Sequence, residues 1–335
     1  MKNLRVCLLI VFAMLLCVAF VPIEYPFQVR TASAVASERV YIGGFPIGIT
    51  LDVGGLLVDG VTGVETEFGT ARIDGFKKGD IIKKINGKDV RSVDDVQLAL
   101  GEDVATVELI RDGKTITIEV RPLIEAYSER PRLGIRIKDK IYGVGTVTFV
   151  RQNGEYAALG HEIYDADTDT HIPFDSGKIY GCKILGIKKG VKGEAGALLG
   201  SIVEGDERGT ISRNDKFGIA GTYTENRPDD DIVEVADRAE VRPGHAKIRT
   251  TIDDEPRMFD IEIIKASRWP GRNEKSLVFR VTDKKLIGLT GGVVRGMSGS
   301  PIIQNGKLVG AVTHVFINDP TRGYGILIDN MLNSD

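Results

Sequence analysis

The chain has 335 residues, which is enough for two domains with cores of their own. Its 44 basic and 47 acidic residues leave a net charge of -3, and no run of Lys or Arg forms a basic stripe. This balance argues against a nucleic-acid partner. Two of the three cysteines lie in an apolar N-terminal run, and the four histidines are scattered, so we expect no internal disulfide framework, no metal and no cofactor.

Residues 1–25 are typical of a membrane-targeting segment. Lys2 and Arg5 precede an unbroken apolar run over residues 6–21. The small-residue sites that could be cleaved after export, within residues 32–36, come well after this run, which favours an uncleaved anchor helix over a removed signal peptide. The positive N-terminal side predicts that the rest of the chain is exported and stays tethered to the membrane. Residues 26–40 form a linker.

The stretch "KKGDIIKKINGKDVRSVDDVQLAL" at residues 77–100 predicts a hairpin followed by a short helix. Asn86-Gly87 is a strong hairpin turn signal between apolar runs. Ser92 is a typical helix N-cap, and Asp95 stands three residues later, where a capping carboxylate helps. The alternating apolar residues of 115–120 then predict a half-buried strand.

These features resemble a PDZ domain, which would make residues 41–124 a small α+β domain. In PDZ domains a hydrophobic-Gly-hydrophobic loop presents backbone N–H groups to a peptide carboxylate, and Ile47-Gly48-Ile49 is similar to that loop. The resemblance implies that a peptide or chain end binds there. Pro46, which lacks an N–H group, departs from the commoner loop.

Residues 125–335 contain short apolar strands separated by turns, without strong helical periodicity. Strands at this spacing predict a β-sandwich or a pair of barrels. The chain is therefore expected to be mainly β.

The motif "GMSGSP" at residues 296–301 is typical of a serine nucleophile on a loop between strands. Attack by a serine hydroxyl leaves negative charge on the substrate oxygen, which backbone N–H groups can stabilise. The loop resembles that of chymotrypsin-like serine peptidases. The resemblance implies a double-barrel peptidase domain, with Ser298 as nucleophile and the N–H groups of Gly296 and Ser298 as the oxyanion hole.

A serine needs a base to act at neutral pH, and His161 in "YAALGH" is the best candidate. It follows a strand-like run and precedes a polar stretch that contains Asp165, Asp167 and Asp169. A lone histidine is more often structural, but the serine motif favours a catalytic role. His314 in "AVTHVF" is more easily explained as a packed or surface strand residue.

Three features together resemble the stage IV sporulation protein B family: "ALGHEIYDADT", "TGGVVRGMSGSPIIQNGKLVGAVTHVFINDPTRGYGI" and the order anchor, PDZ, peptidase. This resemblance implies a catalytic triad of His161, Asp283 and Ser298. The position of Asp283 departs from the usual order, because chymotrypsin-like enzymes usually place the aspartate nearer the histidine. Asp165, Asp167 and Asp169 are rival carboxylates.

Two metal readings of the polar stretch fail. Thr170 stands where a calcium loop of the EF-hand type needs glycine, and Asp165 replaces the second histidine of a zinc-protease helix that would begin at His161. The serious alternative to an enzyme is a tethered, non-catalytic PDZ scaffold, although all three residue types of the triad are present.

The family resemblance implies an exported serine endopeptidase of sporulation, anchored in the forespore membrane and facing the space between the two membranes. Its expected substrate is a membrane-bound regulator of an intramembrane protease, whose cleavage leads to activation of a late sigma factor. The expected partners are thus a protein substrate, a peptide at the PDZ-like domain and the membrane itself.

Overall fold

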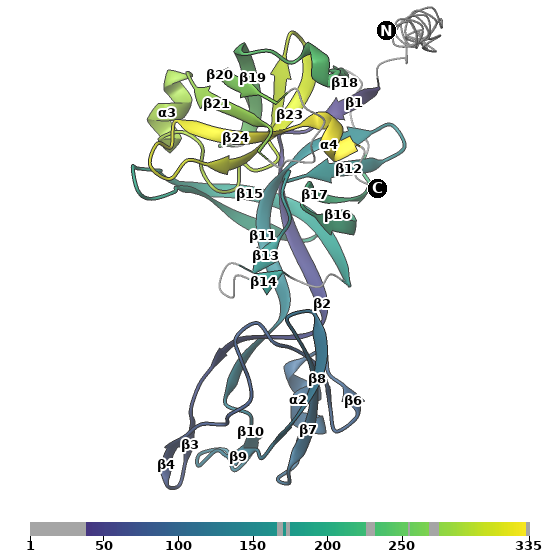
Figure 1. The fold of residues 1–335 in the computed structure, drawn as a ribbon, viewed down its shortest axis with the longest axis vertical. Helices are drawn as coiled ribbons and strands as arrows, with labels where there is room; N and C mark the ends of the chain where they lie inside the picture. Colours follow the sequence, from purple (N-terminus) through teal and green to yellow (C-terminus); the bar gives the residue numbers. More distant parts are fainter. Residues whose placement is uncertain are drawn as a thin grey trace, which may run out of the picture. The chain divides into compact units, whose positions relative to one another are not determined.

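The computed structural model describes residues 38–165, 170–171, 175–225, 232–253, 255–267 and 275–332. Strands dominate, and 18 of them belong to one hydrogen-bonded network (Figure 1), which confirms the expectation of a mainly β protein. Glu38–Asp335 forms one compact unit. The expected anchor, residues 1–25, lies outside the described residues. None of the helices described is long and apolar enough to span a bilayer.

The first group of strands is built around β2, which pairs with β11 on one edge and β15 on the other. Ile47, Ile49 and Leu51 alternate along β2 and are almost fully buried, together with Tyr156 and Ile179. The period of two is what places every second side chain in the core. The strands of this group are β1 (Arg39–Ile42), β2 (Pro46–Val61), β11 (Ile135–Arg151), β12 (Glu155–Ala158), β13 (Tyr164–Asp165), β14 (Thr170–His171), β15 (Ser176–Lys188), β16 (Ala197–Asp215) and β17 (Gly218–Tyr223).

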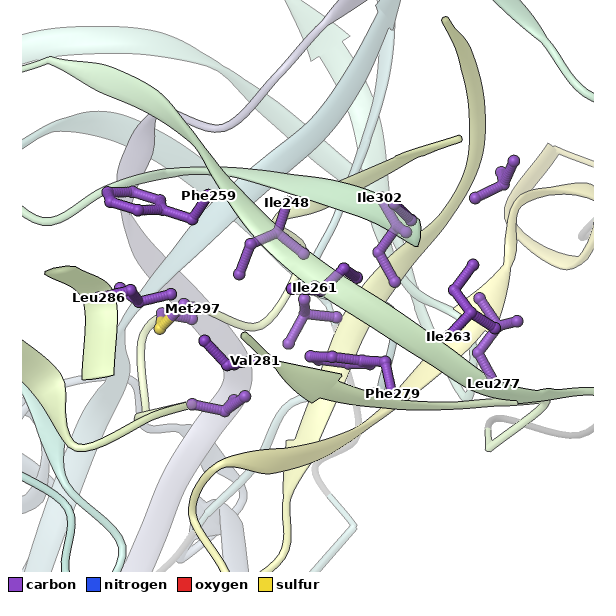
Figure 2. Packing of buried hydrophobic residues seen from close by; sticks show 14 of the residues in the cluster. Ile248, Phe259, Ile261, Ile263, Leu277, Phe279, Val281, Leu286, Met297 and Ile302 are labelled. Carbon is purple, nitrogen blue, oxygen red and sulfur yellow. The ribbon is translucent and has the colours of Figure 1, made fainter. Parts of the chain in front are cut away.

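The second group has a separate core, in which Ile248, Ile261 and Phe279 are fully buried or nearly so (Figure 2). Asn305 and Gly306 form the turn between two antiparallel strands of this group, and both residues have positive φ. This group contains β18 (Ile232–Val235), the 3-10 helix η2 (Arg238–Glu240), β19 (Gly244–Thr251), β20 (Pro256–Ala266), β21 (Leu277–Val281), α3 (Lys284–Thr290), β22 (Pro301–Gln304), β23 (Lys307–Val315), β24 (Arg322–Leu327) and α4 (Ile328–Leu332).

A third core is built from residues between Leu56 and Ile137, and we call this part of the chain the small lobe. The predicted helix is confirmed: the Ser92 hydroxyl accepts from the Asp95 N–H, and the Asp95 carboxylate accepts from the Ser92 N–H in return. The Asn86-Gly87 hairpin is also present. The small lobe contains part of β2 and β11, together with β3 (Val64–Thr66), β4 (Gly69–Ala71), β5 (Ile81–Ile85), β6 (Lys88–Asp89), α2 (Val93–Ala99), β7 (Ala105–Arg111), β8 (Lys114–Val120), β9 (Leu123–Ile124) and β10 (Pro131–Arg132). Its assignment to the PDZ class stays a prediction.

The expected peptide loop at Ile47-Gly48-Ile49 is a strand. These residues lie inside β2 and pair with residues of β11 and of β15, so their backbone groups belong to the sheet on both sides. A Cβ on Gly48 would stand 2.5 Å from a side-chain carbon of Ile202. The loop assignment is therefore wrong. The apolar side chains of this segment are buried in the core around β2, and its backbone is paired with two neighbouring strands.

The two halves of β2 belong to different parts of the structure. Residues 46–52 pair with β11 and β15, whereas Leu56 and Leu57 pair with β5 of the small lobe. The two parts meet at Gly54, where φ is +65°. A start of the PDZ-like domain at residue 41 thus includes a segment whose strand partners lie in the peptidase part of the chain.

Candidate active site

Ser298 lies on a tight loop between α3 and β22, flanked by two glycines at positive φ. Gly296 has φ +93° and Gly299 has φ +94°, a conformation that residues with a side chain rarely adopt. Met297, between Gly296 and Ser298, is fully buried in the second core. Figure 2 shows its side chain beside Leu286 and Val281. The buried Met297 side chain holds the loop in place, while Ser298 stays partly exposed.

Two buried threonines of β11 hold the same loop from the other group of strands. The Thr146 N–H donates to the Ser298 carbonyl (3.0 Å), and the Thr146 hydroxyl donates to the Gly296 carbonyl (2.8 Å). The Thr148 hydroxyl donates to the Gly299 carbonyl (2.8 Å). Sequence reasoning missed both residues. Their signal was the pair of threonines facing one way in the apolar strand "TVTFV".

The N–H groups of Gly296 and Ser298 have no hydrogen-bond acceptor among the described residues. The neighbouring N–H groups of Met297, Gly299 and Ser300 all donate to backbone carbonyls. Buried loops normally satisfy their N–H groups, so an unpaired pair at this position is a donor site for an external oxygen.

His161 follows β12 after a sharp turn in which Leu159 and Gly160 both have positive φ, +70° and +72°. Its Nδ1 atom lies 2.8 Å from the Glu162 carbonyl oxygen. In the tautomer that this contact favours, Nδ1–H donates to the carbonyl and Nε2 carries a lone pair. The imidazole can then accept a proton through Nε2.

His161 and Ser298 line one cleft of about 640 Å³, together with Gly296, Thr313 and His314. The structure thus brings together His161, Ser298 and both oxyanion residues predicted from the sequence. The His161 and His314 rings lie 4.9 Å apart between centroids, tilted by 39°. The position of His314 was not expected, because nothing in "AVTHVF" indicates which ring it would meet.

The Ser298 hydroxyl donates to the Thr313 carbonyl oxygen at 2.7 Å. No hydrogen bond from this hydroxyl to His161 is present among the described residues. A serine held on a carbonyl is a poor nucleophile, since its proton is shared with a group that cannot remove it. Rotation about the Cα–Cβ bond would release it from Thr313.

The structure places Asp283 at the N-cap of α3, outside the residues that line the cleft. One carboxylate oxygen accepts from the Leu286 N–H at 2.9 Å and the other lies 3.5 Å from the Asp260 nitrogen. Of the rival carboxylates, Asp167 and Asp169 lie outside the described residues, and of Asp165 only the backbone is described. The third member of the triad stays a prediction from the resemblance.

Asp283→Asn separates the two roles of this residue. Asn caps helices about as well as Asp, so we expect the midpoint of thermal unfolding to stay within a few degrees of the parent. A role in orienting His161 predicts a loss in kcat of about 10⁴-fold, because the charge that stabilises the imidazolium is removed. Peptide hydrolysis and thermal unfolding measured on the same preparation distinguish the two. An intact kcat would assign Asp283 to capping alone.

His314 lies beside His161 in the cleft. Burial is the main cause that lowers its pKa to about 4, and the charge of His161 adds to the effect. Its Nδ1 atom is buried and has no hydrogen-bond partner among the described residues. His314 is therefore neutral near pH 7, and it does not compete with His161 for a proton.

The low pKa of His314 predicts a pH-dependent stability. Below pH 6.5 the unfolded chain binds a proton at this residue and the folded chain does not until about pH 4. The free energy of unfolding should thus fall as the pH is lowered from 6.5 to 4. Urea unfolding across this range should show a smaller fall in His314→Gln than in the parent. Parallel curves for the two proteins would contradict this environment for His314.

Among the described residues, no group of His, Cys, Asp and Glu is arranged to hold a metal ion. The cleft offers a hydroxyl, two imidazoles and two backbone N–H groups.

The model of the SpoIVB peptidase S55 family matches residues 129–332. A search of curated proteins found no match.

Solved structures resemble the chain only distantly. The HtrA-type protease AlgW with a tripeptide is 13% identical with a TM-score of 0.34, over 57% of this chain and 54% of that one. AlgW with a decapeptide is 11% identical with a TM-score of 0.34, over 61% and 55%. The active form of the Rv3671c protease of M. tuberculosis is 15% identical with a TM-score of 0.34, over 57% and 72%. The chain thus spans about half the length of the AlgW chains, and TM-scores this low carry no argument.

The family match is a match of sequence, and the matched residues 129–332 include both His161 and Ser298. Because it extends over more than half of the chain, the chain belongs to the SpoIVB peptidase S55 family.

Proposed function

We propose that Ser298 is the nucleophile of this peptidase and that His161 is its general base. Nε2 of His161 takes the proton of the Ser298 hydroxyl as the oxygen attacks the scissile carbonyl carbon. The same proton then passes to the leaving amine, and water hydrolyses the acyl-enzyme by the same route. The observation that carries this proposal is the cleft in which both side chains meet two unpaired N–H groups.

The N–H groups of Gly296 and Ser298 form the oxyanion hole in this proposal. The negative charge of the tetrahedral intermediate develops on an oxygen that both groups can reach, and each such donor is worth about 10²- to 10³-fold in rate. The Ser298 hydroxyl must leave the Thr313 carbonyl before it can donate to His161. The arrangement described here is thus a resting one that substrate binding converts.

The biological role that we propose is intercompartmental signalling in sporulation. The substrate is a membrane-bound regulator of an intramembrane protease, and its cleavage activates a late sigma factor. The enzyme is exported and held by residues 1–25 in the forespore membrane, facing the space between the two membranes. Membership of the SpoIVB family and the apolar run at residues 6–21 support this proposal. Family membership also disfavours a non-catalytic scaffold.

The role is tested in an endospore-forming host that lacks its own enzyme of this family. We expect the full chain to restore processing of the late sigma factor, and Ser298→Ala to restore none. A form in which a cleavable export signal replaces residues 1–25 should restore it late or weakly. Full restoration by that soluble form would contradict the proposed tether, and restoration by Ser298→Ala would contradict a catalytic role in signalling.

Capture of a peptide by the small lobe is part of the proposal. A second hydrophobic-Gly-hydrophobic pattern, Leu133-Gly134-Ile135, lies where β11 begins, with Gly134 at φ +63°. The N–H groups of Leu133 and Gly134 have no acceptor among the described residues. These groups can serve the function that the sequence suggested for Ile47-Gly48-Ile49.

A further inference from the structure

The cleft around Ser298 has a basic rim. Lys138, Lys140 and Arg295 line it, against a single carboxylate among its described lining residues, Glu162. Three positive charges and one negative charge leave a local excess of two positive charges, in a chain whose net charge is -3. Among the described lining residues the charge balance is thus positive, whereas that of the chain as a whole is negative.

Two of these cations are not neutralised by the described parts of the protein. The side chains of Arg295 and Lys140 are exposed and have no ion-pair or hydrogen-bond partner among the described residues. Lys138 differs, since its ammonium lies 3.5 Å from a carboxylate oxygen of Asp59. Many other surface cations of the chain are paired, such as Arg151 with Glu38 and Lys188 with Glu194.

The backbone of Arg295 is fixed beside the oxyanion residues. Its N–H donates to the Gly196 carbonyl at 2.9 Å, and its carbonyl accepts from the Leu198 N–H at 2.8 Å. Gly296 follows Arg295 directly in the sequence, so the Arg295 side chain branches from the residue next to the predicted oxyanion hole. Lys140 stands on β11 in the register opposite Asp52, next to an irregularity in the pairing of β11 with β2. The backbone of both residues thus has a defined place, while their charged side chains are exposed and can reach a bound peptide.

The lining of the cleft is mostly aliphatic. Val293 and Val294 are each 2% exposed, and Val315 and Ile317 continue the lining on and beyond β23. A peptide that fills the cleft displaces water from this surface. Charges close to an apolar wall interact more strongly than charges in open water, because the local dielectric is lower.

We propose that this cleft selects acidic protein segments, with Arg295 and Lys140 contacting Asp or Glu side chains that flank the scissile bond. The inference rests on the proposed catalytic function of Ser298 and names its substrate class. Exposed ion pairs contribute about 0.2–1 kcal/mol each, or roughly 1.4- to 5-fold in an equilibrium constant. Long-range attraction adds to the association rate and weakens with salt.

The test compares two peptides that share the same residues at the scissile bond and differ only in their flanks, which carry Asp and Glu in one and Asn and Gln in the other. We expect the parent to prefer the acidic peptide by about 5- to 20-fold in kcat/KM at low salt, from two ion pairs and steering. The preference should shrink when NaCl is raised to about 0.5 M, where the Debye length falls to a few Å. Equal kcat/KM values would overturn the inference.

Charge reversal identifies the residues responsible. Arg295→Glu and Lys140→Glu should each reduce the ratio of kcat/KM for acidic over neutral peptide, and the double variant should bring it to one or below. Arg295→Lys should keep most of the preference, since it keeps the charge. Lys114→Glu, on the exposed β8 strand of the small lobe, changes the net charge equally and should leave the ratio unchanged. A ratio that falls equally in Lys114→Glu would contradict a local effect.

Failure of this inference can be told from failure of the proposed function. Labelling of the parent by a serine hydrolase probe, lost in Ser298→Ala, supports the catalytic assignment whatever the peptide preference is. If labelling depends on Ser298 while both peptides are cleaved equally, only the acidic selectivity is wrong. If labelling does not depend on Ser298, the catalytic assignment itself is wrong.

Discussion

Replacing Ser298 or His161 by Ala should each lower kcat for peptide hydrolysis by about 10⁵- to 10⁶-fold, and the double variant should lose no more than either single one. The reason is that nucleophile and base act as a unit: the serine does not attack without loss of its proton, and the imidazole has nothing to activate without the serine. Stopped assays with a fluorogenic peptide and labelling by a hydrolase probe measure the two effects.

Ser300→Ala is the matched control for this prediction. Ser300 stands two residues after Ser298, is fully buried, and its hydroxyl has no hydrogen-bond partner among the described residues. Removing an unpartnered hydroxyl should change stability and kcat little. Substantial turnover by Ser298→Ala, or a loss in Ser300→Ala as large as that in Ser298→Ala, would show that the wrong serine has been assigned.

The local features of this site were predictable from the sequence because they depend on neighbouring residues. The glycines around Ser298 indicate backbone that only glycine adopts easily, and both have positive φ. Ser92 with Asp95, and Asn86 with Gly87, are also short-range signals, and the structure confirms both. Each of these patterns has a physical cause within a few residues of the chain.

Features that depend on distant partners were not predictable. Nothing near Ser298 indicates that its hydroxyl donates to the Thr313 carbonyl, or that the Thr146 hydroxyl holds the Gly296 carbonyl across 150 positions. The same limit explains the error at Ile47-Gly48-Ile49. A hydrophobic-Gly-hydrophobic pattern fits a loop or a buried strand, and pairing with β11 and β15 decides between them.

The sequence alone does not decide between two roles for Asp283. An Asp directly before a helical segment is a common N-cap, and that is the position it occupies here. The resemblance implies a catalytic role that local physics neither requires nor forbids. Only a measurement on a variant that keeps the cap and removes the charge can separate the two.

Gly299→Ala should be the most damaging single-methyl change in the serine loop. A Cβ at this position would stand 1.9 Å from the Thr146 carbonyl oxygen and 2.5 Å from the Leu159 nitrogen, both backbone atoms that cannot rotate away. The positive φ of +94° adds a penalty of about 1–2 kcal/mol, and overpacking adds about 1–3 kcal/mol. Since the serine loop packs against Thr146 of β11 and against Leu159 in the turn before His161, probe labelling should fall together with stability.

Gly306→Ala separates the effect of positive φ from the effect of close backbone contacts. Gly306 also has positive φ, +78°, but a Cβ there would meet no atom within 4 Å. It should lose only about 1–2 kcal/mol of unfolding free energy and keep full probe labelling, whereas Gly299→Ala should lose about 2–5 kcal/mol and most of its labelling. Urea unfolding and probe labelling of the two variants decide the matter. Equal losses in both would mean that backbone strain alone accounts for Gly299, and that the close approach of Thr146 and Leu159 does not constrain the serine loop.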